Sequence, residues 1–125
     1  MAKSETIAGA TLDVLSPEEV KERFDRNEIV LIDVRTPAEF AFEHIKGALL
    51  YPLSSFDPNK LPGQSEKPIV FHCGSGIRSR KVAEACAAAG MTRLAHTDGG
   101  FGAWKSAGLP FLAIDATTGS TVSKP

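Results

Sequence analysis

The sequence predicts a single α/β domain in which a mostly parallel sheet carries helices on both faces, giving three layers. Short runs of β-branched and aliphatic residues alternate with segments that open on helix-capping residues, as in strands joined by helices. The 125 residues suffice for one hydrophobic core. The 2 cysteines are too few for a disulfide scaffold, and no His/Cys spacing is that of a zinc site.

Capping patterns mark where the predicted helices begin. Ser16-Pro17-Glu18-Glu19 combines an N-cap serine, a proline at the first helical position and a glutamate at the third, which is a capping box. Thr36-Pro37-Ala38-Glu39 repeats this pattern. The predicted helices are 16–24, 36–42, an Ala-rich stretch at 79–89 that stops at Gly90, and a segment after Asp98-Gly99-Gly100 that carries Phe101 and Trp104 and closes near Gly108.

Apolar runs between these helices predict buried strands. Residues 29–34 and 69–72 are continuous runs of the kind found in parallel strands whose two faces are both covered. Shorter runs predict strands at 48–51 and 92–96. Residues 53–67 contain prolines and a glycine, so we expect an irregular connection with at most one helical turn.

The two ends of the chain lack periodicity. Residues 1–9 and 114–125 are therefore predicted to be flexible tails around one domain at 10–113. The net charge of −1 gives no basic excess for a general nucleic-acid binder. No apolar run approaches the roughly 20 residues that span a bilayer, and no secretory signal is visible. We expect a soluble, cytoplasmic protein, and the sequence leaves its oligomeric state open.

The segment from His72 to Ser79 joins a strand end to a helix start, which is where open α/β sheets bind ligands. Gly74 and Gly76 permit positive φ, so successive N–H groups can turn inward and hold an anion. The following helix adds its N-terminal N–H groups, and Arg78 adds a bidentate cation. This field favours a thiolate at Cys73, whose pKa should be lowered.

These features predict that Cys73 is a nucleophile that attacks an anionic substrate. The alternative is a buried cysteine followed by an ordinary glycine-rich turn. A cysteine alone would favour that alternative. The strand end, the two glycines, the arginine and the helix together favour a functional site.

The spacing from Cys73 to Arg78 is C-x4-R, which resembles the active-site loop of the rhodanese family of sulfurtransferases. Cysteine phosphatases use C-x5-R, one residue longer. Residues 31–40 with 44–48 look like the family's N-terminal signature, and residues 98–104 with 108–110 look like its C-terminal one. The resemblance covers about 12–112, and the chain is identified as similar to single-domain rhodanese-like sulfurtransferases.

This resemblance implies a ping-pong cycle. Cys73 would take a sulfane sulfur from a small anionic donor and pass it, as a persulfide, to cyanide, a thiol or a sulfur-carrier acceptor. No metal or organic cofactor is implied. The residues expected to bind the substrate and the persulfide are Gly74, Ser75, Gly76, Ile77, Arg78 and Ser79. Gly74-Ser75-Gly76 resembles loops that use 3-mercaptopyruvate, whereas Arg78 and the helix dipole favour thiosulfate, so both donors stay open with thiosulfate preferred.

Three residues are candidates for support of the site. Asp33 could hydrogen-bond the loop, orient Arg78, or accept from the next helix N-terminus. Arg35 and Glu39 are four apart and are expected to pair with each other. Phe101, close to the predicted Asp98-Gly99-Gly100 turn, is expected to line the pocket.

We expect the other histidine, tryptophan and cysteine side chains considered to have structural roles. His72 alternates in direction with Cys73 and should point away from the pocket. His44 should be a hydrogen-bonded scaffold residue and Trp104 a core residue. Cys86 lies about 10 Å along its helix, too far to bridge Cys73, and is interpreted as a small core residue whose redox role stays open.

Two other functions compete with sulfur transfer. The chain could be a rhodanese-like module that binds a partner without turnover, although an intact Cys73 and Arg78 argue against it. It could also be a cysteine phosphatase or arsenate reductase with Asp98 as a general acid, although C-x4-R argues against that. The physiological donor, acceptor and pathway are not predicted.

Overall fold

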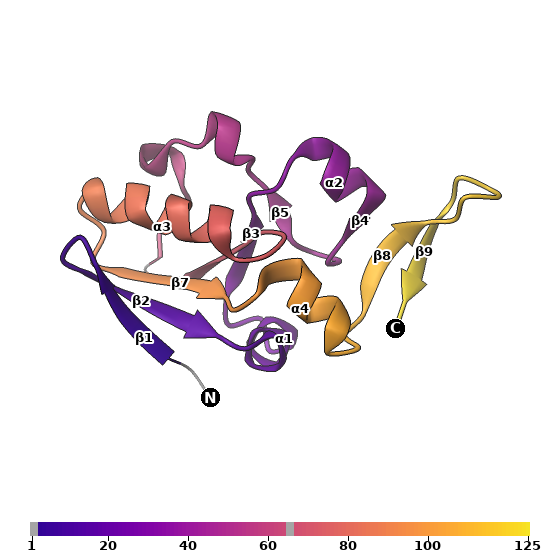
Figure 1. Ribbon diagram of the computed structural model, residues 1–125, viewed down its shortest axis with the longest axis horizontal. Coiled ribbons are helices and arrows are strands. Elements are labelled where there is room, and N and C mark those ends of the chain that lie inside the picture. Colours follow the sequence, from indigo (N-terminus) through magenta and orange to yellow (C-terminus); the bar gives the residue numbers. More distant parts are fainter. Residues whose placement is uncertain (1–2, 65–66) are drawn as a thin grey trace.

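A computed structural model describes residues 3–64 and 67–125 and has a central six-stranded sheet (Figure 1). The strand order is β1-β2-β7-β6-β3-β5, with β1 antiparallel to β2 and every other pair parallel. The predicted α/β class and the mostly parallel sheet are confirmed. The strands are β1 (Lys3–Ile7), β2 (Ala10–Leu15), β3 (Val30–Asp33), β5 (Leu49–Leu50), β6 (Ile69–His72) and β7 (Arg93–Thr97).

Helices cover both faces of this sheet, as predicted. On one face, α3 (Ile77–Ala88) and the 3-10 turns η1 (Leu53–Ser55) and η2 (Pro58–Lys60) enclose a core that we call the α3-side core. On the other, α1 (Pro17–Asp25) and α4 (Gly100–Ser106) enclose the α1-side core. Successive residues of β3 and β6 alternate between the two cores, because side chains of a strand point to opposite faces in turn. No helix among the described residues is long and apolar enough to cross a membrane.

The ends of the chain form hairpins, so the prediction of two flexible tails is wrong for the residues that the structure describes. β1 pairs with β2 through a tight turn at Ala8 and Gly9, both with positive φ. At the other end, β8 (Phe111–Ile114) pairs with β9 (Thr121–Lys124) and with β4 (Glu43–His44) in a separate three-stranded sheet. The terminal strands β1 and β9 are sheet edges whose residues are largely exposed. Their sequences therefore show no alternation of apolar and polar residues that would have predicted a strand. Residues 1–2 lie outside the described residues.

The connection predicted at 53–67 contains two 3-10 turns, η1 and η2, rather than at most one helical turn. Pro58 starts the second turn, and the side chain of Asp57 caps it by accepting from the N–H of Asn59 at 2.9 Å. Residues 65–66 lie outside the described residues. The short helix α2 (Pro37–Phe42) begins at the predicted capping box, in which Thr36 and Glu39 bond each other's backbone N–H groups.

The N-terminus of α4 docks directly on the chain that follows β6. The N–H of Phe101 donates to the carbonyl of Cys73 at 2.7 Å, and that of Gly102 donates to the carbonyl of Gly74 at 3.0 Å. This contact requires a glycine at position 100, since a Cβ there would lie 2.3 Å from the Cys73 oxygen. Gly100 also has φ +60°, a conformation that side chains disfavour.

The imidazole of His72 is buried without hydrogen-bond partners in the described part of the chain. His72, on β6, has no exposed surface, and neither ring nitrogen has a hydrogen-bond partner among the residues that the structure describes. Its ring packs edge-on against Phe101, with centroids 5.9 Å apart. Burial lowers the pKa of His72 to about 4, against the opposing effect of Asp33, so the imidazole stays neutral.

We predict that Gly100→Ala displaces the chain after β6 and destabilises the fold. The matched control is Gly108→Ala, because Gly108 also has a positive φ, +75°, but would place its Cβ against nothing within 4 Å. The free energy of unfolding, from urea titration, should fall by about 1–3 kcal/mol more for Gly100→Ala than for the control, because of the backbone overlap. Equal losses would contradict the close-approach argument.

We predict that His72 makes the fold less stable as the pH falls from about 6.5 toward 4. In that window the unfolded chain takes up a proton on His72 while the folded chain does not, so unfolding is favoured at lower pH. The full contribution is about 3 kcal/mol at pH 4. The measurement is urea unfolding of the natural protein and His72→Leu across this range. The natural protein should lose more stability than the variant, and parallel profiles would refute the prediction.

Candidate active site

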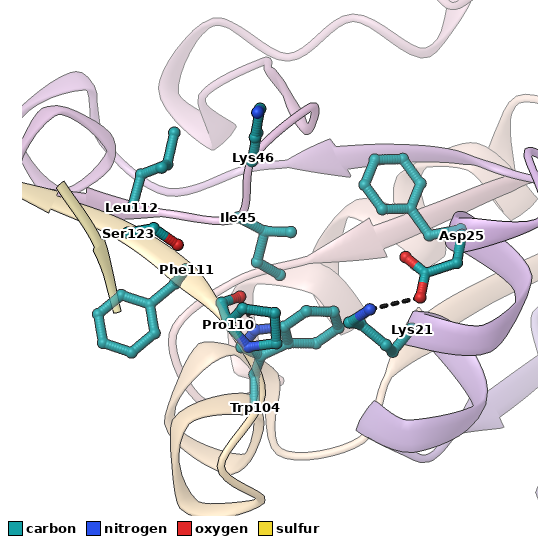
Figure 2. Close-up of a pocket in the computed structure, with 10 residues that line it drawn as sticks. Lys21, Asp25, Ile45, Lys46, Trp104, Pro110, Phe111, Leu112 and Ser123 are labelled. Atoms are coloured by element: carbon teal, nitrogen blue, oxygen red, sulfur yellow. Dashed lines mark hydrogen bonds and ion pairs between the residues drawn. The ribbon is translucent and has the colours of Figure 1, made fainter. Parts of the chain in front are cut away.

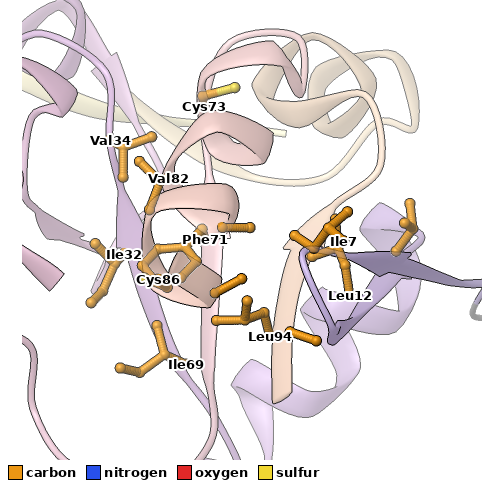
Figure 3. Packing of buried hydrophobic residues seen from close by; sticks show 14 residues of the cluster. Ile7, Leu12, Ile32, Val34, Ile69, Phe71, Cys73, Val82, Cys86 and Leu94 are labelled. Carbon is orange, nitrogen blue, oxygen red and sulfur yellow. The ribbon is translucent and has the colours of Figure 1, made fainter. Parts of the chain in front are cut away.

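Cys73 directly follows β6, which lies between β7 and β3 inside the parallel part of the sheet. The carboxyl ends of these strands share one edge, which is the expected ligand-binding edge of such a sheet. The residue has 0% of its surface exposed and belongs to the α3-side core. Figure 3 shows its side chain at the end of that core, beyond Val82 and Phe71. The nucleophile predicted from the sequence is therefore a buried sulfur.

Hydrogen-bond donors surround this sulfur. The N–H of Gly76 donates to Cys73 Sγ at 3.0 Å, and Ser79 Oγ lies 3.5 Å from Sγ. Burial alone would raise the pKa of Cys73. Hydrogen bonds from the Ser79 hydroxyl and from the N–H groups of Ser79, Gly76 and Ser75 outweigh burial and lower the pKa. The arrangement stabilises a thiolate, in the direction that the sequence predicted.

Only residues 74–76 separate Cys73 from the helix, so the loop itself is shorter than the segment from Cys73 to Arg78. α3 begins at Ile77, not at Ser79 as expected, so Ile77 and Arg78 belong to its first turn. Gly76 is the N-cap with φ +101°; of the two glycines that permit a positive φ, only Gly76 uses it, and Gly74 lies outside the left-handed region. A Cβ at position 74 would lie 3.0 Å from Arg78 Nη2, so a side chain there would require the guanidinium to shift.

Arg78 is paired with Glu39 of α2. Its Nη1 and Nη2 donate to the two Glu39 carboxylate oxygens at 2.7 and 3.0 Å. Hydrogen bonds from Arg78, together with those from Thr36, lower the pKa of Glu39 to about 2 against the effect of burial. The predicted pairing of Glu39 with Arg35 is therefore wrong. The guanidinium lies over Gly74, and the Glu39 carboxylate neutralises its charge.

Asp33, Arg35 and Phe101 form one buried cluster behind the loop. Arg35 Nε and Nη2 donate to the Asp33 carboxylate at 2.8–3.0 Å, and Nη2 also donates to the carbonyl of Glu43 at 2.7 Å. The guanidinium carbon lies 4.5 Å from the centroid of the Phe101 ring. Asp33 thus orients Arg35, not Arg78. Phe101 belongs to the α1-side core and contacts the site through its backbone N–H.

The side chains interpreted as structural lie where expected. His72 faces the α1-side aromatic residues, away from the Cys73 sulfur, as strand alternation predicts. Cys86 is a free thiol in the α3-side core, and burial raises its pKa to about 11. His44 is a hydrogen-bonded scaffold residue, since its Nδ1 lies 2.7 Å from the Phe40 carbonyl oxygen.

Sequence reasoning missed one residue of the site. His96, on β7, places Nδ1 2.8 Å from Ser79 Oγ, next to the Cys73 sulfur. The available signal was a histidine at the end of a predicted strand, where the carboxyl ends of parallel strands meet. Ser79, counted among the loop residues, is buried on α3 and links the two.

One hollow of the surface lies beside the site and another lies away from it. The first, of about 250 Å³, borders Arg78 and is lined by Val34, Arg35, Thr36, Pro52, Leu53 and Ser54. The second, of about 230 Å³, lies between α1, α4 and the second sheet and includes no residue of the Cys73 loop (Figure 2). Among residues 3–64 and 67–125, no group of three or more His, Cys, Asp or Glu side chains could hold a metal ion.

Known proteins resemble the chain over about three quarters of its length. The uncharacterized protein slr1261 of Synechocystis sp. is 38% identical over 96 residues, which are 77% of this chain and 54% of that protein, so the chain spans about half its length. The thiosulfate sulfurtransferase GlpE of Actinobacillus succinogenes is 29% identical over 77% of this chain and 86% of its own. A rhodanese-like domain protein of Staphylococcus aureus has a solved structure that is 28% identical, with a TM-score of 0.64 over 73% of this chain and 89% of its own.

The family profile of the rhodanese-like domain matches residues 16–107. That range starts at the N-cap of α1 and closes just after α4, so it contains the Cys73 loop and both helices that hold it. The match covers most of the chain and takes in every element that surrounds the sulfur, and the chain belongs to the rhodanese-like domain family.

Proposed function

We propose that the chain is a sulfurtransferase that carries a sulfane sulfur on Cys73. The observation that carries this proposal is the buried Cys73 sulfur, held at the N-terminus of α3 by the Gly76 N–H and the Ser79 hydroxyl, with a lowered pKa. Only a thiolate attacks sulfur efficiently, so such an environment suits a nucleophile better than a core residue. The similarity to proteins named thiosulfate sulfurtransferase supports the same reaction.

The first half-reaction loads the enzyme. The Cys73 thiolate attacks the outer sulfur of thiosulfate, a new S–S bond forms, and the bond to the sulfonate sulfur breaks. Sulfite leaves with the bonding electron pair, and Cys73 becomes a persulfide anion. The N–H groups that favour the thiolate also suit this anion, because both carry one negative charge at the same end of α3.

The second half-reaction unloads it. Cyanide, or the thiolate of an acceptor, attacks the outer sulfur of the persulfide, and Cys73 leaves as a thiolate. No proton is needed in either displacement once the thiolate exists. The hydrogen bonds to Sγ therefore serve both as activation of the nucleophile and as stabilisation of the leaving group.

Arg78 is the cation that suits a dianionic donor, and Glu39 holds it. Cys73 has 0% exposed surface, and the Arg78 guanidinium covers Gly74. A donor that reaches the sulfur must therefore displace Glu39 from Arg78, and the loop must open. Thiosulfate carries two negative charges and competes for Arg78 better than the monoanion 3-mercaptopyruvate. We therefore favour thiosulfate as the donor.

Intact-protein mass spectrometry tests the cycle. After incubation with thiosulfate or 3-mercaptopyruvate, the protein should gain the mass of one sulfur, which cyanide removes. Cys73→Ser should gain none, because the nucleophile is gone. Cys86→Ser should gain it like the natural protein, because the Cys86 thiol stays protonated and buried.

Each other outcome selects a different function. Sulfur loading that persists on Cys73→Ser with an intact fold would falsify the proposal. No loading from either donor would favour a module that binds a partner without turnover. Hydrolysis of an aryl phosphate that disappears in Cys73→Ser would favour a phosphatase.

We predict that Glu39→Gln strengthens the use of thiosulfate. The neutral amide of this variant can still contact Arg78, but the guanidinium charge is no longer neutralised, so KM for thiosulfate should fall by about three- to tenfold, with a smaller change for 3-mercaptopyruvate. The effect should shrink at high ionic strength. The assay is steady-state thiocyanate formation at several salt concentrations.

Glu19→Gln is the matched control for this variant. Glu19 is likewise the third residue of a helix and forms an ion pair with an arginine, Arg23, at 2.9 Å, but it lies on α1. Glu19→Gln should leave the KM for thiosulfate unchanged. An unchanged or higher KM in Glu39→Gln would mean that Arg78 does not bind the donor.

A further inference from the structure

A buried chain of polar side chains leads from the Cys73 sulfur to β7. Ser79 Oγ lies 3.5 Å from Cys73 Sγ, 2.8 Å from His96 Nδ1 and 3.2 Å from the carbonyl oxygen of Gly76, to which the hydroxyl can donate in place of His96 or the sulfur. Cys73 and Ser79 have 0% exposed surface and His96 has 6%. The path between the sulfur and the imidazole is therefore shielded from solvent.

The hydrogen-bond capacity of Ser79 decides which states this chain can adopt. A hydroxyl has one proton to donate and can accept from two sides. When Cys73 is a thiol, it can donate to Ser79, and Ser79 can donate to an unprotonated His96 Nδ1. When Cys73 is a thiolate, Ser79 must donate to Sγ, and His96 Nδ1 must then carry a proton to bond with the Ser79 oxygen. The Gly76 carbonyl does not depend on Ser79, because it also accepts from the N–H of Arg80 at 3.1 Å.

We propose that His96 is a positioning residue that accepts, through Ser79, the proton that Cys73 loses when its thiolate forms. The Cys73 proton moves to Ser79 Oγ as the Ser79 proton moves to His96 Nδ1. The products are a thiolate, an intact serine hydroxyl that donates to it, and an imidazolium. No proton or electron is gained or lost overall. The proposal deepens the proposed function, because it concerns how the same sulfur is activated.

The surroundings of His96 agree with this role. Burial lowers the pKa of His96, so at neutral pH the ring is uncharged while Cys73 is a thiol, and it needs a negative charge nearby to hold a proton. Three charged side chains face it: Glu5 on β1, Asp98 after β7 and Arg80 on α3. The two carboxylates favour an imidazolium and Arg80 opposes it; Glu5 is itself paired with Arg80, and Asp98 with Lys3. A thiolate on the far side of the serine adds a further negative charge that stabilises the imidazolium.

The ultraviolet absorbance of the thiolate, followed against pH, tests the proposal without any sulfur donor. Its result therefore stands apart from the loading experiment: failure to load sulfur would overturn the proposed function and leave this titration interpretable. Cys86, with a pKa of about 11, remains a thiol over the range used, and Cys73→Ser supplies the baseline. In the natural protein the signal should rise in two steps. In the first, the Cys73–His96 pair loses one proton and part of the molecules become thiolate–imidazolium; in the second, the pair loses its other proton and the molecules that still hold a thiol become thiolate.

Two variants of His96 separate proton acceptance from hydrogen bonding. The side-chain amide of the His96→Asn variant can still donate to Ser79 but takes up no proton, so the thiolate should form in one step. His96→Leu removes both functions, and the pKa of Cys73 should rise by about one unit, a tenfold change in its ionisation constant. The matched control is His44→Leu, since His44 bonds the carbonyl of Phe40 away from the loop; its titration should equal that of the natural protein.

A double variant decides whether His96 acts through Ser79. Ser79→Ala should raise the pKa of Cys73, and adding His96→Leu should raise it no further, because the link is already broken. A further rise would overturn the relay, and so would two-step titration in His96→Asn or an unchanged titration in His96→Leu. Near-ultraviolet circular dichroism checks that each protein is folded, and His96→Asn, the smaller change, carries the test if His96→Leu unfolds.

Discussion

The site must keep a negative charge on a sulfur atom that belongs to a hydrophobic core. A comparison of the two cysteines in the α3-side core shows which feature of the environment favours the thiolate. Cys86 meets only burial, which raises its pKa to about 11, whereas the pKa of Cys73 is lowered. The difference lies in the hydrogen-bond donors around Cys73, the Gly76 N–H and the Ser79 hydroxyl above all, since hydrogen bonds to a charged group in a region of low dielectric are strong.

The backbone after β6 is fixed from two sides. The carbonyl groups of Cys73 and Gly74 point to α4, where they accept from Phe101 and Gly102. The N–H group of Gly76 points instead to the sulfur, and its φ of +101° makes that turn available to glycine in particular. The close approach of Gly100 to the Cys73 carbonyl therefore acts on the sulfur indirectly: by engaging the carbonyls, α4 leaves the N–H groups of the loop for the anion.

Features set by neighbouring residues were predictable from the sequence, and features set by the meeting of distant elements were not. The Thr36–Glu39 capping box, the strand before Cys73 and the opposite directions of His72 and Cys73 follow from local spacing and agree with the structure. The Arg35–Glu39 pair failed because Arg35 precedes the N-cap of α2, so helical spacing does not apply to it. The edge strands β1 and β9 lack an apolar pattern because solvent faces them. His96 was missed because its partner Ser79 is 17 residues away on another element.

The charges around the sulfur are arranged in pairs, and this pairing links sulfur loading to proton transfer. Arg78 is matched by Glu39, and Arg35 by Asp33, so neither guanidinium presents an unbalanced charge to the resting thiol. A dianionic donor that displaces Glu39 brings negative charge to a site where Cys73 must also become negative. Repulsion between donor and thiolate would oppose the reaction unless a positive charge forms nearby at the same time. An imidazolium at His96, reached through Ser79, supplies that charge without bringing a cation in from solvent, so the relay matters most at the step in which the donor is bound.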